Sequence, residues 1–338
     1  MREYVINKMI RILFVSNSFS TFVKKDIALL KEHHTLIFLH YKGLKTLVYF
    51  LPRLIKSIRQ ADLTISRFAD NHAFYTIMLS KIFHKKSIII IGGYELASLP
   101  GLKYGLNRSV FFPRIVKYIL RKSDQILVVS ESLKKDAIER FNIKASKILV
   151  VPNGYDSKTI HPSGQKENKV LTAAIGSHER TIKLKGLDVF SESAKYLPEV
   201  KFEIIGLKSS IHEEFEKHIP SNVRLLNSLP QDKLIHVMQK AKVYCQLSMR
   251  EGHPNTLCEA MLCECVPVGT DVPGIRAVIG DMGFLVPLKD PQATAVAIKN
   301  ALQSNGGRAA RERISRLYPL LKRQKSLDEI IQTLWEKS

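Results

Sequence analysis

Long apolar runs are missing from this 338-residue sequence, and that absence limits what the chain can be. No run approaches the roughly eighteen apolar residues that a membrane-spanning helix needs. The apolar part of residues 1–18 is short and interrupted by charge, which argues against a signal peptide. We therefore expect the protein to be cytoplasmic, in the cytosol or peripheral on the cytoplasmic face of a membrane.

Cysteine is also scarce, with four residues in the whole chain, as expected for a reducing compartment. Cys258, Cys263 and Cys265 cluster near His253, so a metal site has to be considered. Their spacing matches no zinc pattern, and buried cysteine behaves as a small apolar residue. No acidic triplet in the sequence suits a divalent ion, so we expect no metal.

Motifs for cofactors and for nucleic acids are absent as well. No G-x-G-x-x-G follows the first predicted strand, so a dinucleotide is not expected and we predict no cofactor. No recognition motif and no basic stretch with interleaved aromatic residues indicates nucleic-acid binding. A basic nucleic-acid-binding protein remains an alternative that rests on charge alone.

Acidic residues are few relative to basic ones, 31 against 52, which gives a net charge of +21. Residues 1–160 hold 27 basic and 11 acidic residues, a net +16, and the remainder holds 25 and 20, a net +5. A basic first half indicates an anionic partner such as membrane lipid, polyphosphate or nucleic acid.

The length predicts two domains, and an apolar content of 45% is enough for ordinary packed cores. Apolar strands alternate with helices in both halves, which predicts an α/β fold with two doubly wound parallel sheets. The boundary is expected within residues 152–168, where Pro-Asn-Gly turn chemistry is followed by a polar segment. We assign 1–155 to the first domain and 165–315 to the second.

One stretch, residues 248–274, carries most of the chemistry. Glu251 and Gly252 follow an apolar strand, at the sheet edge where ligands bind in open α/β folds. A helix is predicted over 255–263, with Pro254 suited to its first turn. The free N–H groups and positive dipole end of such a helix hold an anion such as phosphate.

The same helix is predicted to have two distinct faces. Asn255 and Glu259 lie four positions apart, so they share a face that can point toward a ligand. Leu257, Ala260 and Met261 fall on the opposite side and are expected in the core. Glu251 and Glu259 could then accept hydrogen bonds from sugar or ribose hydroxyls on either side of a bound phosphate.

Taken whole, the run EGHPNTLCEAM followed by CVPVGTDVPG resembles the signature of retaining glycosyltransferase family 4, also called glycosyl transferases group 1. The resemblance spans nearly the whole chain and is strong from about residue 123. It implies the GT-B fold, in which two Rossmann-like domains face each other across a cleft. It also implies metal-independent transfer of a sugar from a nucleotide-diphosphate sugar to a hydroxyl of a glycan or lipid-linked acceptor, with retained configuration.

The resemblance implies roles for particular residues. We expect Glu251 to act on the transferred sugar as the catalytic residue, and Glu259 to hold the ribose. The helix start would bind the diphosphate. The expected donor-binding residues in this stretch are Gly252, His253, Asn255, Thr256 and Glu259.

A second donor-binding segment is expected near residue 185. The family uses a Lys before a Gly, and Lys185 precedes Gly186 here. The family's Arg directly after the strand glycine is replaced by Ser177, so Arg180 or Lys183 would substitute, and we choose Arg180. Fixed cations stabilise the negative charge that develops on the diphosphate as the sugar–phosphate bond breaks.

The acceptor side is less clearly marked. Family members often have a histidine at the end of the strand predicted over 86–91, where this chain has Gly92, Gly93 and Glu95. Glu95, and His72 in the preceding predicted loop, are our candidates for lining the acceptor site. The family's last helix packs back on the first domain, so residues 318–338 should do the same through Leu334 and Trp335.

Two stretches of the first domain, residues 42–60 and 108–123, mix basic and large apolar residues. Both are predicted as helices that either lie in an anionic membrane interface or turn an ordinary apolar stripe toward the sheet.

An alternative enzyme class is a GT-B nucleotide-sugar epimerase, which needs acid/base groups on both sides of the sugar. The sequence offers no such pair.

Overall fold

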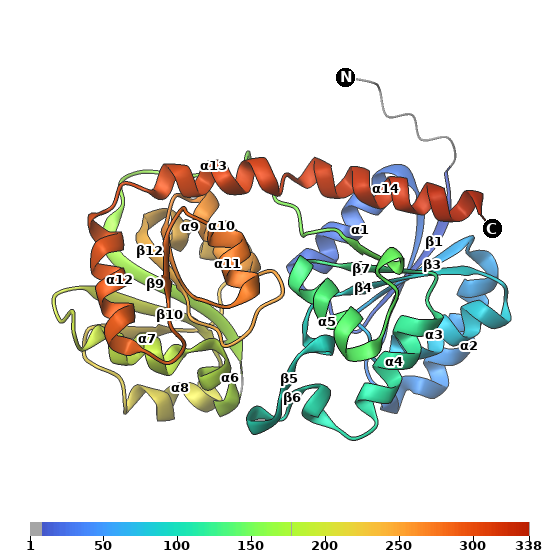
Figure 1. The fold of residues 1–338 in the computed structure, drawn as a ribbon, viewed down its shortest axis with the longest axis horizontal. Helices are drawn as coiled ribbons and strands as arrows, with labels where there is room; N and C mark the ends of the chain where they lie inside the picture. The colour runs from blue at the N-terminus through green and yellow to red at the C-terminus, as the bar shows by residue number, and fades with distance from the viewer. Residues whose placement is uncertain (1–8, 177, 338) are drawn as a thin grey trace. The chain divides into compact units, whose positions relative to one another are not determined.

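The computed structural model describes residues 9–176 and 178–337, which form two compact units (Figure 1). Unit 1 holds the chain up to Asn153 and again from Leu320, and unit 2 holds Gly154–Pro319. The chain passes from unit 1 to unit 2 between Asn153 and Gly154, inside the range 152–168 that the sequence indicated. It returns to unit 1 at Leu320, two residues after position 318, where the tail was expected to begin.

Unit 1 is built on a six-stranded parallel sheet with the strand order β2-β1-β3-β4-β7-β8. Parallel strands are covered on both faces, so they read as continuous apolar runs, and residues 88–91 are four buried isoleucines. The strands are β1 (Arg11–Ser16), β2 (Thr35–His40), β3 (Leu63–Arg67), β4 (Lys86–Ile91), β7 (Gln125–Val128) and β8 (Ile148–Val150).

Helices cover both faces of this sheet. Because neighbouring residues of a strand point to opposite faces, Ile12 lies in the same buried cluster as Leu327 of the last helix, whereas Leu13 lies in the cluster that contains Leu54 of α2. The helices of unit 1 are α1 (Thr21–His33), α2 (Leu47–Gln60), α3 (Asn71–Ile82), α4 (Phe112–Lys122), α5 (Glu131–Phe141) and α14 (Leu320–Glu336).

The tail helix α14 belongs to the core of unit 1. Leu327 and Ile331 are fully buried, four positions apart, on the face that packs against the sheet and α1. Leu334 and Trp335, the two residues expected to make this contact, pack against the same cluster.

Between β4 and α4 the chain makes a long excursion that contains a two-stranded hairpin of β5 (Ser98–Leu99) and β6 (Tyr104–Gly105). Gly105 has a φ of +67°, and a Cβ there would lie 2.1 Å from the carbonyl oxygen of Ala97, so the turn requires glycine. Short 3-10 turns of unit 1 are η1 (Leu44–Thr46), η2 (Tyr94–Leu96), η3 (Pro100–Leu102), η4 (Leu106–Arg108) and η5 (Ala145–Lys147).

Unit 2 repeats the plan with a second six-stranded parallel sheet, in the order β11-β10-β9-β12-β13-β14. The chain runs from β9 outward to β11 and then returns to the other side of β9, so the strand order reverses between β9 and β12. The strands are β9 (Glu167–Gly176), β10 (Lys201–Leu207), β11 (Val223–Leu226), β12 (Ala241–Gln246), β13 (Val266–Thr270) and β14 (Phe284–Val286).

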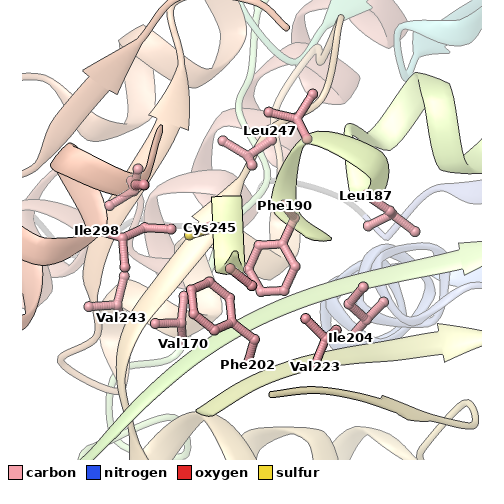
Figure 2. Packing of buried hydrophobic residues seen from close by; sticks show 14 of the residues in the cluster. Val170, Leu187, Phe190, Phe202, Ile204, Val223, Val243, Cys245, Leu247 and Ile298 are labelled. Carbon is pink, nitrogen blue, oxygen red and sulfur yellow. The ribbon is translucent and has the colours of Figure 1, made fainter. Parts of the chain in front are cut away.

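Two clusters of buried apolar residues cover the faces of the unit 2 sheet. Figure 2 shows one of them, in which the rings of Phe190 and Phe202 meet edge to face with centroids 5.2 Å apart. The helices are α6 (Glu179–Lys185), α7 (Leu187–Ala194), α8 (Ser209–Glu216), α9 (Gln231–Lys240), α10 (Asn255–Leu262), α11 (Pro273–Ile279), α12 (Pro291–Gln303) and α13 (Gly307–Leu317).

Several helices differ from the sequence predictions, among them α1, α6 and α11. The sequence predicts a helix over residues 27–32, but α1 begins at Thr21, because Val23 and Asp26 already lie on its buried face. Helix α6 has only seven residues, too few for a clear apolar period, and the sequence did not indicate it. The sequence predicts a loop over residues 271–274, but helix α11 starts at Pro273, since proline suits a first helical turn.

Across residues 9–176 and 178–337, no helix is both long enough and apolar enough to span a membrane.

Candidate functional site

The candidate site of unit 2 lies where β9 and β12 end side by side. This is the point at which the strand order reverses, and ligands of open α/β sheets bind outside the carboxyl ends of the strands there. The segment after β9 contributes α6 with Lys185. The segment after β12 contributes Glu251 and the start of α10.

Glu251 accepts three hydrogen bonds on the same carboxylate oxygen. Its Oε1 lies 2.7 Å from Nζ of Lys185, 2.8 Å from Oγ of Ser248 and 3.2 Å from Nε2 of Gln246. Lys185 and Glu251 are 66 positions apart in the sequence, so the fold brings together two residues that the sequence placed in separate segments of the donor site.

Lys185 is held in place by the residue that follows it. It ends α6, and Gly186 then takes the left-handed conformation with a φ of +64°. A Cβ on Gly186 would lie 2.2 Å from the carbonyl oxygen of Leu247, so α6 packs closely on the segment that leads to Glu251. The side chain of Lys185 keeps 28% of its surface exposed, enough for a ligand to reach it.

A second diphosphate-binding cation is expected from the sequence upstream of Lys185. Ser177, where the family has its Arg, lies outside the described residues. Lys183 donates a hydrogen bond to Oδ2 of Asp188 at 2.8 Å, and this bond raises the pKa of the Lys183 ammonium. Arg180 is exposed on the first turn of α6.

Helix α10 presents its amino end at the same place. Pro254 precedes it, and as the N-cap residue it makes no side-chain hydrogen bond to the first turn. Its leading N–H groups are therefore suited to an anion. Asn255 accepts a hydrogen bond on Oδ1 from the hydroxyl of Tyr155 at 2.6 Å, and Thr256 donates to Oε1 of Gln246 at 3.3 Å.

Glu259 and Gly252 occupy the neighbourhood that the sequence indicated. Glu259 lies one turn after Asn255 on α10 and is 4% exposed, and Gly252 is buried beside the start of α11. A Cβ on Gly274 would lie 2.2 Å from the carbonyl oxygen of Glu251, so α11 packs directly on this loop. Leu257 and Met261 are fully buried in the core, as predicted.

His253 is part of an aromatic cluster. Its ring stacks on Tyr155 with centroids 6.0 Å apart and meets the ring of Tyr318 edge to face at 4.7 Å. The backbone N–H of Tyr155 donates to the carbonyl of Tyr318 at 2.9 Å, where the chain enters and leaves unit 2. Two tyrosines 163 positions apart carry no sequence signal for this contact, and neither was predicted.

The cysteines of unit 2 are buried free thiols. Burial raises the pKa of Cys263 to about 12 and that of Cys265 to about 11, so both are protonated at neutral pH. Among the residues that the structure places, no group of three or more His, Cys, Asp or Glu is arranged to hold a metal ion.

His72 of unit 1 lies on α3 and not in a loop, which corrects the sequence prediction. Asp70 caps this helix by accepting from the N–H of Asn71, so the helix begins before His72. The imidazole is fully buried, and its Nε2 donates to the carbonyl of Arg67 at 2.8 Å. Burial lowers the pKa of His72 to about 4, so the ring is neutral at physiological pH.

Glu95 is buried as well, with 1% of its surface exposed. Its carboxylate accepts the backbone N–H groups of Gly93 at 2.8 Å, and of Gly92 and Ala69 at 3.2 Å. Burial raises the pKa of Glu95. The side chains of His72 and Glu95 therefore make hydrogen bonds to backbone groups of neighbouring residues in unit 1, and they expose almost no surface to a substrate.

Comparisons with known proteins agree with this architecture. The family model described as glycosyltransferase family 4 matches residues 10–159, and the model described as glycosyl transferases group 1 matches residues 156–317. Among solved structures, Anabaena HepE in complex with UDP-glucose matches with a TM-score of 0.77 and 14% identity, covering 96% of this chain and all of that one. The sucrose-phosphate synthase of Thermosynechococcus elongatus matches with a TM-score of 0.78 and 15% identity, covering 98% and 100%.

The curated sequence relatives match this chain over only part of their own length. A phosphatidylinositol N-acetylglucosaminyltransferase protein of Arabidopsis thaliana is 23% identical over 263 residues, which cover 75% of this chain and 57% of that protein. The N-acetylgalactosamine-N,N'-diacetylbacillosaminyl-diphospho-undecaprenol 4-alpha-N-acetylgalactosaminyltransferase of Campylobacter jejuni is 24% identical over 249 residues, 71% of this chain and 67% of that one. The chain thus spans a little over half of the Arabidopsis relative, and 42% of the yeast relative named GPI3.

The two family models together account for residues 10–317, and each coincides with one parallel-sheet unit apart from the tail. The solved structures that match along almost the whole chain have the same fold. The chain belongs to the family 4 glycosyltransferases, with the GT-B fold.

Proposed function

We propose that this chain transfers a sugar from a nucleotide-diphosphate sugar to a lipid-linked hydroxyl acceptor, with retained configuration and without a metal ion. The observation that carries the proposal is the contact between Lys185 and Glu251, on the loop that leads to the start of α10. A cation, a carboxylate and a helix amino end meet where the strand order reverses. This combination suits a ligand with a diphosphate at one end and hydroxyl groups at the other.

Each group has a distinct task. The leading N–H groups of α10 and the ammonium of Lys185 bind the diphosphate and stabilise the charge that grows on it as the sugar leaves. Glu251 accepts hydrogen bonds from hydroxyls of the transferred sugar, and Glu259 accepts them from the ribose. Arg180 is exposed on the first turn of α6 and supplies a second cation when the donor is bound.

A lipid-linked acceptor is supported by the relatives and by the surface of unit 1. The Arabidopsis relative is named for phosphatidylinositol and the Campylobacter relative for a diphospho-undecaprenol carrier. Such acceptors stay in a membrane, so an enzyme that uses them has to reach the lipid surface. Unit 1 has the charge and the exposed apolar residues for that contact.

Helix α2 and the turn before it lie in a segment, residues 33–61, that contains no Asp or Glu. The apolar stripe of α2 faces the core, with Leu54 and Ile58 fully buried, as one of the two alternatives from the sequence requires. The start of the helix carries a second apolar group: Val48 is 77% and Tyr49 75% exposed. Large exposed apolar residues among lysines and arginines suit the interface of an anionic bilayer.

Helix α4 repeats this arrangement. Residues 96–123 also contain no Asp or Glu, and Val110 and Phe111 before the helix are 77% and 70% exposed. Helix α3 packs against both α2 and α4, so the two helices lie on the same side of the sheet (Figure 1). We define the basic-apolar surface as Leu44, Lys45, Val48, Tyr49, Arg53, Lys56, Val110, Phe111, Arg114, Lys117 and Arg121.

Attraction to an anionic membrane is worth about 1 kcal/mol for each Lys or Arg near the surface. The six basic residues of the basic-apolar surface, with a few inserted apolar side chains, are enough for reversible binding without a spanning helix. A soluble acceptor would need none of these features.

The transferase proposal is tested by measuring UDP binding and sugar transfer separately. The probes are UDP-glucose and UDP-N-acetylglucosamine, with vesicles that contain phosphatidylinositol or an undecaprenyl-diphosphate-linked sugar. We expect Glu259→Gln to weaken UDP binding and Glu251→Gln to lower turnover while UDP binding persists. The exposed Glu199→Gln serves as the matched control. Wild-type behaviour of both site variants would refute the assignment, and absence of any nucleotide binding would refute the function.

A further inference from the structure

Gln246 is a buried amide in an otherwise apolar strand. It ends β12, where it follows Val243, Tyr244 and Cys245, and it is 4% exposed. Burying an amide is unfavourable unless its hydrogen bonds are made. A leucine would fill the same strand position at no such cost, so the hydrogen bonds of this amide need an explanation.

The amide uses its full hydrogen-bonding capacity of two donors and two acceptor positions. Nε2 donates to Oγ of Ser248 at 2.8 Å and to Oε1 of Glu251 at 3.2 Å. Oε1 accepts from the hydroxyl of Thr256 at 3.3 Å and from that of Tyr244 at 3.4 Å. One side chain therefore joins the strand, the loop that carries Glu251 and the first turn of α10.

These contacts fix the orientation of the Glu251 carboxylate. Gln246, Ser248 and Lys185 all donate to Oε1, from three different positions along the chain. Within residues 9–176 and 178–337, no group donates a hydrogen bond to Oε2. The carboxylate is thus held by one oxygen, and the other is the one that a ligand can engage.

We propose that Gln246 is a positioning residue that holds Glu251 at a fixed distance and angle from the start of α10. Through Thr256 it ties the sugar-binding carboxylate to the helix that binds the diphosphate. This inference rests on the proposed function, because it assigns the fixed spacing to the two ends of a nucleotide-diphosphate sugar. Gln246 itself need not touch the ligand.

Two substitutions test whether Gln246 positions Glu251 or only fills space in strand β12. Gln246→Leu keeps the volume and removes every hydrogen bond, so Glu251 loses a donor and its link to α10. We expect kcat to fall by about 10- to 100-fold, the usual effect of a small misplacement of a reacting group. The affinity for UDP should change less than twofold, because the four hydrogen bonds of Gln246 are made to side chains and none to a backbone N–H of α10.

Gln246→Glu places a second carboxylate 3.2 Å from Oε1 of Glu251 in place of a donor. Like charges at this distance raise the pKa of the pair. We expect the acidic limb of the kcat profile to move to higher pH by about one unit or more. Gln303→Glu, the same change at an exposed position on α12, should leave the profile unchanged.

A measurement without substrate keeps this inference separate from the proposed function. In protein labelled with ¹³C at the glutamate carboxyl, the Glu251 signal is assigned from its loss in Glu251→Gln. Its titration should shift upward in Gln246→Glu and stay in place in Gln303→Glu. An unshifted titration together with wild-type kcat in Gln246→Leu would overturn the inference. If the titration shifts and no nucleotide binds, the contact stands and the transferase assignment falls.

Discussion

Arg323 on α14 and Asp26 on α1 are 297 positions apart and share two hydrogen bonds, from Nε to Oδ1 at 2.7 Å and from Nη2 to Oδ2 at 2.9 Å. Arg67 at the end of β3 donates to the same carboxylate at 2.6 Å. All three side chains are buried. Nη1 of Arg323 also donates to the carbonyls of Val151 and Pro152, just before Asn153, the residue at which the chain leaves unit 1.

We predict that Asp26→Asn destabilises unit 1 by about 3–5 kcal/mol, because two buried guanidinium groups lose their anion. Burial by itself would raise the pKa of Asp26, but Arg323 and Arg67 outweigh it and hold the pKa below its usual value. The stabilisation is therefore complete above the unfolded-state pKa of about 3.9 and is lost as the pH falls through the lower folded-state value.

Urea denaturation at pH 7 and at several values below pH 4 checks this prediction. The difference between wild type and Asp26→Asn should be largest at neutral pH and should shrink in acid. The exposed Asp281→Asn is the control and should change stability little at any pH. A difference that grows as the pH falls would contradict the assigned role of Asp26.

We predict that Lys185→Ala costs about 1–3 kcal/mol of binding free energy for UDP, the range for a hydrogen bond to a charged group. Uridine, which has no phosphate, should bind both forms alike. Lys183→Ala is a matched control on the same helix, because its ammonium pairs with Asp188. Calorimetry that finds equal losses for UDP and uridine would place Lys185 away from the diphosphate.

We predict that Gly186→Ala disrupts the site from the backbone. The new Cβ would lie 2.2 Å from the carbonyl oxygen of Leu247, and the φ of +64° is strained for any other residue. The contact between Lys185 and Glu251 should be lost, so UDP affinity and thermal stability should fall together. Gly164→Ala also has a positive φ but open space around it, and should cost only about 1 kcal/mol of stability. Similar melting temperatures for the two variants would contradict the close approach.

We predict that unit 1 binds anionic vesicles in a salt-sensitive manner, because attraction to exposed charges is screened within a Debye length. Changing Lys45, Arg53, Lys56 and Arg59 to Glu should abolish sedimentation with these vesicles. The same reversal at four exposed lysines of unit 2 alters the net charge equally and should leave binding largely intact; these are Lys201, Lys233, Lys240 and Lys299.

A separate variant tests whether apolar side chains of unit 1 insert into the vesicle membrane. Val48→Ser with Tyr49→Ser keeps every charge and should weaken binding at all salt concentrations, since buried apolar area adds to electrostatic attraction. Wild-type protein that stays in the supernatant with anionic vesicles at low salt would refute membrane binding. A soluble acceptor would then be favoured, and the transferase assignment would be unaffected.

Much of the fold could be predicted from sequence because parallel strands are buried on both faces. Runs such as residues 88–91 or 243–247 have no alternating polar positions, and turn residues bound them. The start of α10 was predictable for a different reason, since Pro254 and the following helical period lie within one short stretch. The fold class and the placement of Glu251 after a strand follow from these local patterns.

The parts that were missed depend on residues far apart in the chain. His72 and Glu95 look like polar loop residues in sequence, and only the packing shows that their partners are backbone groups of unit 1. Gln246 is one polar residue in an apolar run, and its role depends on Thr256 and Glu251 arriving beside it. Arg323 lies in a basic tail that gives no hint of Asp26.

The distribution of two rare residue types gives each unit its own spectroscopic reporter. Trp335 is the one tryptophan of the chain and lies on α14 in unit 1, whereas all four cysteines lie buried in unit 2. Indole fluorescence therefore follows the opening of one unit, and the rate of thiol labelling follows the opening of the other. A native chain, without added probes, can thus show whether its two halves unfold in one cooperative step or in succession.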